Sequence, residues 1–73
     1  MDSAKLVTMA NQIAGFFTVQ RGEPAEAAAK HIADNWDPRM RAGLAAHLAA
    51  GGEGLSPVAR AAAEALAAHI PRV

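Results

Sequence analysis

The sequence predicts an all-α protein, a small bundle of about four short helices joined by turns that contain proline and glycine. Apolar residues recur at three- and four-residue spacing, and no run alternates apolar and polar residues as a strand does. Pro24, Pro38 and Pro57 each stand where a helix can begin, because the first helical position does not need an N–H donor. With 73 residues, the chain is expected to form one domain, residues 1–73.

The first helix is expected over residues 3–20, where one stripe carries apolar side chains. The opposite side is polar but almost uncharged, since Asp2 and Lys5 are the only charges in residues 1–20. Two interpretations remain open: a helix covered on both sides, with its amide side chains bonded to a neighbour, or an exposed helix of low solubility. The stripe consists of Leu6, Met9, Ala10, Ile13, Phe16, Phe17 and Gln20.

The other three helices are expected over residues 24–36, 38–50 and 57–69, and the last is closed by Pro71. Each has a stripe that suits burial, although alanine fills most of the second and fourth. In chain order the stripes are Ala25, Ala28, Ala29, Ile32 and Trp36; Met40, Leu44, His47 and Leu48; and Val58, Ala62, Ala65 and His69. The outer faces carry two pairs of opposite charge at i,i+4 spacing, Glu26–Lys30 and Arg60–Glu64.

The helix ends have recognisable capping residues. Asp37 and Ser56 precede prolines and are expected to be N-caps, since each side chain can accept a backbone N–H bond. Gly51 and Gly52 suit a left-handed end of the third helix. Although glycine-rich, this loop follows a helix and lacks a lysine, so a plain connection is expected rather than a phosphate site.

Composition excludes several classes of protein. Apolar residues make up 52% of the chain, but twenty of them are alanine, so the core is thin and a partner would stabilise it. The chain has no cysteine, which excludes disulfides and thiolate metal sites, and its net charge is zero, which argues against nucleic-acid binding. No stretch has the length of a membrane span and no signal peptide is recognisable, so a cytoplasmic chain without a membrane partner is expected.

No catalytic, cofactor-binding or metal-ligating residues are predicted, so the chain is not expected to be an enzyme by itself. His31, His47 and His69 lie on three different helices and on faces that disagree, and no His-x-x-x-His pair exists. Ser3 and Ser56 are explained as caps, and the acidic residues are scattered over outer faces.

The segment from Asn35 to Arg41 combines the only tryptophan, a helix end and a helix start. Trp36 is expected to fill the corner between two helices. Arg39 points away from the apolar stripe of its helix, so its guanidinium is available to a carboxylate on another chain. Tryptophan and arginine are also the side chains most enriched in interface hot spots.

The segment Trp36-Asp37-Pro38-Arg39-Met40-Arg41 resembles the delta subunit of soluble NAD-dependent, molybdenum-containing formate dehydrogenase. The resemblance covers nearly the full chain. Its further parts are Lys5-Leu6-Val7, Met9-Ala10-Asn11-Gln12-Ile13-Ala14, Phe16-Phe17, His31-Ile32, His47-Leu48, Gly51-Gly52 and Gly54-Leu55-Ser56-Pro57.

The resemblance implies a non-catalytic accessory subunit that docks on the large alpha subunit and supports stability, assembly or cofactor maturation. The chain would be linked to the beta and gamma subunits through the alpha subunit. In such complexes the molybdenum bis-pterin cofactor, iron–sulfur clusters, FMN and NAD belong to other subunits. The residues expected at the partner interface are Asn11, Gln12, Phe16, Phe17, Trp36, Asp37, Arg39 and Arg41.

Three other functions remain open. A dedicated assembly chaperone would share every sequence feature but would leave the mature enzyme. A helical DNA-binding regulator would use the two helices around Asp37-Pro38, but the third helix offers only Arg39 and Arg41 before a run rich in alanine. A self-associating alanine-rich bundle would need a heptad seam, which the sequence does not specify.

Overall fold

The computed structural model describes residues 3–19 and 22–68, and these contain four helices and no strand. The helices are α1 (Ser3–Thr18), α2 (Pro24–Asn35), α3 (Pro38–Ala49) and α4 (Pro57–Ala68). The predicted all-α class is therefore confirmed, and the predicted starts of all four helices agree with the structure. Gln20, His69 and Pro71, which were placed at or beyond helix ends, lie outside the described residues.

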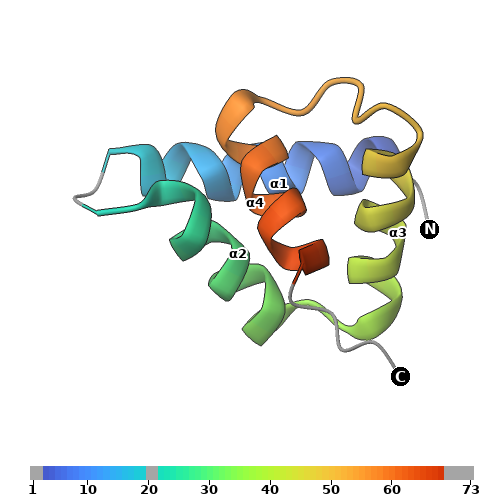
Figure 1. Cartoon of the computed structure of the whole chain (residues 1–73), viewed down its shortest axis with the longest axis horizontal. Helices are drawn as coiled ribbons and strands as arrows, with labels where there is room; N and C mark the ends of the chain where they lie inside the picture. The colour runs from blue at the N-terminus through green and yellow to red at the C-terminus, as the bar shows by residue number, and fades with distance from the viewer. Residues whose placement is uncertain (1–2, 20–21, 69–73) are drawn as a thin grey trace.

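Helix α1 lies across the other three, and α4 lies between α2 and α3 (Figure 1). Helices α1 and α4 each pack against all three other helices, whereas α2 and α3 meet mainly through the short link between them. This arrangement leaves one long side of α1 facing away from the bundle.

The N-caps predicted at Asp37 and Ser56 are present. The backbone N–H of Met40 donates to Asp37 Oδ1 over 2.8 Å, and the N–H of Ala59 donates to Ser56 Oγ over 3.2 Å. Each bond satisfies an amide in the first turn of a helix, where no backbone carbonyl is within reach. The first turns of α3 and α4 are therefore fixed by the residue before each proline.

Helix α3 ends at two glycines in the left-handed region, as predicted. Gly51 has φ 123° and Gly52 has φ 65°. The N–H of Gly52 returns to the carbonyl of His47 over 2.9 Å, which satisfies a carbonyl in the last turn of the helix. This turn directs the chain back toward α1.

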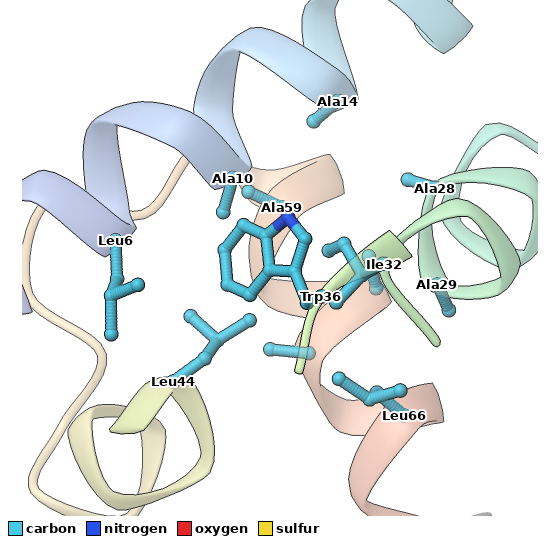
Figure 2. Close-up of a cluster of buried hydrophobic side chains, with 12 residues drawn as sticks. Leu6, Ala10, Ala14, Ala28, Ala29, Ile32, Trp36, Leu44, Ala59 and Leu66 are labelled. Carbon is cyan, nitrogen blue, oxygen red and sulfur yellow. The ribbon is translucent and has the colours of Figure 1, made fainter. Parts of the chain in front are cut away.

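The core is built from small side chains around one large ring. Seven of the twelve buried apolar residues are alanine, so the helices approach one another closely. Figure 2 shows the indole of Trp36 next to Ala10 and Ala59 and close to Leu44 and Ile32. The complete set is Leu6, Ala10, Ala14, Ala28, Ala29, Ile32, Trp36, Leu44, Ala59, Ala62, Ala63 and Leu66.

The contact between α1 and α3 depends on a glycine. A Cβ atom added at Gly43 would lie 2.7 Å from Cδ1 of Leu6, which is closer than real Cβ contacts. Because Leu6 is buried, its side chain has little room to move away. Glycine at position 43 therefore sets how near α3 comes to α1.

Neither of the two i,i+4 pairs of opposite charge forms an ion pair in the described structure. The Lys30 ammonium pairs with Asp34 at 3.0 Å, one turn further along α2, instead of with Glu26. The Arg60 guanidinium donates to the carbonyls of Gly51 and Gly52, at 2.8 and 3.3 Å, instead of pairing with Glu64. The loop carbonyls attract Arg60 because they lie at the end of α3 and have no helical partner.

Candidate functional site

The corner between α2 and α3 uses most of its polar groups inside the chain. Trp36 is only 5% exposed, so the prediction that it fills the corner is confirmed. Arg41 reaches back from α3 and donates from Nη1 to the carbonyls of Ala33 and Trp36, both at 2.9 Å. Because these carbonyls end α2, the guanidinium acts as a C-terminal cap. Together with the N-cap Asp37, these side chains hold α2 and α3 at a fixed angle.

Arg39 differs from its neighbours in the corner. It is exposed at the start of α3, and it has no hydrogen bond or ion pair with any other described residue. The prediction that it points away from the buried stripe is confirmed. Of the four corner residues predicted at the interface, Arg39 alone has a charged group that no described part of the chain uses.

Asn11 joins α1 to the loop that precedes α4. Its Nδ2 donates to the Gly54 carbonyl over 2.9 Å, and its Oδ1 accepts from the Ser56 N–H over 2.9 Å. The amide thus satisfies one acceptor and one donor of a loop that has no regular secondary structure. The Asn11 amide is therefore bonded to a loop of its own chain and not to a partner protein.

Three aromatic rings meet at the far end of α1. The Phe16 and Phe17 rings are 5.2 Å apart and almost perpendicular, and Phe17 lies edge-on to His31 at 5.8 Å. Phe17 is half-buried and packs against the core, whereas Phe16 is 60% exposed. The two consecutive phenylalanines therefore face different surroundings, one toward the bundle and one toward solvent.

The exposed side of α1 is open and almost uncharged. We define the outer face of α1 by Lys5, Thr8, Gln12, Gly15 and Phe16, together with Val19 just beyond the helix end, all of which are exposed. Lys5 is the only charged residue of α1, and a Cβ atom at Gly15 would meet no atom within 4 Å. The Thr8 hydroxyl donates to the Ala4 carbonyl, so it already has a partner within the helix. Phe16 and Val19, 60% and 84% exposed, are the exposed large apolar residues of the described chain.

A groove of about 430 Å³ lies between α2 and α4. Three of the six residues that line it are alanine, and its one ammonium group, on Lys30, is already paired with Asp34. The residues that line it are Glu26, Ala29, Lys30, Ala33, Ala65 and Leu66.

The histidines do not come together in the described structure. His31 is exposed beside Phe17, and His47, half-buried as expected, places Nε2 2.7 Å from the Glu53 carbonyl. His69 lies outside the described residues. Within residues 3–19 and 22–68, no three His, Cys, Asp or Glu side chains are grouped so that they could hold a metal ion.

Sequence reasoning missed two features of this arrangement. Val19 is not among the predicted interface residues, although an apolar side chain beside uncharged neighbours is a visible signal in the sequence. The second feature is the set of hydrogen bonds that Asn11, His47 and Arg60 make to the loop between α3 and α4. No sequence signal indicates these bonds, because each joins a side chain to a backbone carbonyl or amide. Backbone groups carry no sequence identity, so these pairings depend on the fold.

Residues 5–63 match the family of NADH-dependent formate dehydrogenase delta subunits, FdsD. The chain belongs to this family. The match confirms the resemblance carried by the Trp36–Arg41 segment, and all eight predicted interface residues of this delta-subunit family member lie within it. No curated protein matches the chain. In the described part of the chain, no helix has the length and apolarity that crossing a bilayer requires.

Proposed function

We propose that this delta-subunit family member is a non-catalytic subunit that docks on the large molybdenum-containing subunit of NAD-dependent formate dehydrogenase and stabilises it. The observation that carries the proposal is the outer face of α1, which stays open and nearly uncharged in a chain whose family is defined by a multi-subunit enzyme. A helix that faced only solvent would normally carry charges on that side. We expect the complex to lie in the cytoplasm, which suits a chain without cysteine.

The proposed contact centres on Phe16, with Gln12 and Val19 beside it. Burial of the exposed part of the Phe16 ring would contribute about 1–2 kcal/mol. Gly15 lets a partner backbone approach α1 closely, because no side chain stands between them. Gln12 has no hydrogen bond with another described residue, so its amide remains available to a partner.

Arg39 supports a second, smaller contact. Figure 1 places the start of α3 and the Phe16 end of α1 at different ends of the molecule, so one flat patch does not include both. An exposed guanidinium without a partner in the described chain suits a carboxylate on the large subunit. In this proposal Trp36, Asp37, Arg41, Asn11 and Phe17 act indirectly, because they fix the helices that present Arg39 and Phe16.

Docking would stabilise the large subunit by mass action. A partner that binds only the folded state adds about 2.7 kcal/mol to its stability when present at one hundred times the dissociation constant. The same argument holds in reverse, so the large subunit would stabilise the thin, alanine-rich core of this chain. Each protein would then be most stable in the complex.

The redox groups are assigned to other subunits in this proposal. Iron–sulfur clusters are held mostly by Cys thiolates, and a Rossmann-type NAD site needs a glycine-rich turn after a strand. This sequence has no cysteine, and its described part is entirely helix, turn and loop. The residues therefore do not fit these groups, and the proposed role is structural support of the subunits that hold them.

The test is an affinity purification of the tagged chain from the source cell, with formate-dependent NAD reduction measured on the eluate. The proposal predicts that the large molybdenum subunit and its iron–sulfur and flavin partners elute in fixed ratio to the chain and with activity. Elution of the chain alone, or with nucleic acid, would contradict it. Elution with an inactive large subunit only, and absence from active enzyme, would instead identify an assembly chaperone.

A further inference from the structure

We draw no further inference here: the strongest candidate, the groove of about 430 Å³ between α2 and α4, half of whose lining residues are alanine, carries none because nothing in the structure shows what covers it.

Discussion

The corner between α2 and α3 and the outer face of α1 were both predicted to contact a partner, but their side chains are used differently. In the corner, the Trp36 ring is buried, Asp37 caps α3 and Arg41 caps α2, so these groups already have partners in the chain. On the outer face of α1, Gln12 and Phe16 have no comparable role in the fold. The difference separates residues that build the protein from residues that are free to bind.

This comparison teaches that hot-spot composition alone does not locate an interface. Tryptophan and arginine are enriched in interfaces because they combine large contact area with directed hydrogen bonds. The same properties suit a sharp corner in a small bundle, where Trp36 fills space and Arg41 satisfies carbonyls. Substitutions in the two regions should therefore have different effects, on stability in the corner and on docking along α1.

The largest expected effect is that of Trp36→Ala. Removal of a buried indole leaves a cavity and should cost about 3–5 kcal/mol, which a chain of this size cannot easily lose. We expect loss of the cooperative melting transition when helicity is followed by circular dichroism. Phe16→Ala is the control, since most of its ring is already exposed, and should melt near the wild-type temperature. If Trp36→Ala and Phe16→Ala melted at similar temperatures, the claim that the corner builds the fold and the outer face of α1 does not would be contradicted.

A smaller effect is expected for Arg41→Met. This change keeps the length of the side chain but removes the donor to the Ala33 and Trp36 carbonyls, at a cost of about 2 kcal/mol. In a domain this small the melting temperature should fall by roughly 10 °C. Arg39→Met is matched in chemistry and lies two residues away, and it should leave the melting temperature unchanged. An equal fall in melting temperature for both variants would show that the Arg41 cap does not stabilise the fold.

The smallest effect is expected for Asn11→Ala. It removes two bonds to a partly exposed loop, so we expect a loss of about 1 kcal/mol. The amide protons of residues 51–56 should also exchange faster with solvent, because the loop loses its attachment to α1. Gln12→Ala is the matched control on the adjacent residue. If the amide protons of residues 51–56 exchanged at the same rate in both variants, the two Asn11 hydrogen bonds would not stabilise the loop.

The helices and their starts could be predicted because their signals are local. Pro38 and the Asp37 cap act within one turn, and the left-handed glycines after α3 are needed wherever a helix must reverse. The position of Trp36 followed from its place in a stripe at a helix end. These features require no knowledge of distant parts of the chain.

The polar contacts could not be predicted in the same way. Arg60 lies one turn before Glu64 on its own helix, but it bonds to the carbonyls of Gly51 and Gly52, nine and eight residues earlier. Asn11 bonds to a loop more than forty residues later. Such choices depend on which unpaired backbone groups the fold brings near, and helical spacing does not contain that information.

The measurement that tests the central claim most directly is the amount of large subunit that co-purifies with a tagged Phe16→Glu chain. Ala46→Glu, which adds the same charge at an exposed position on α3, is the matched control. We predict that both variants melt like the wild type. Phe16→Glu alone should co-purify with at least tenfold less large subunit, which corresponds to a loss of about 1.4 kcal/mol in binding free energy. A folded Phe16→Glu chain that retained the wild-type ratio of large subunit would contradict docking through the outer face of α1.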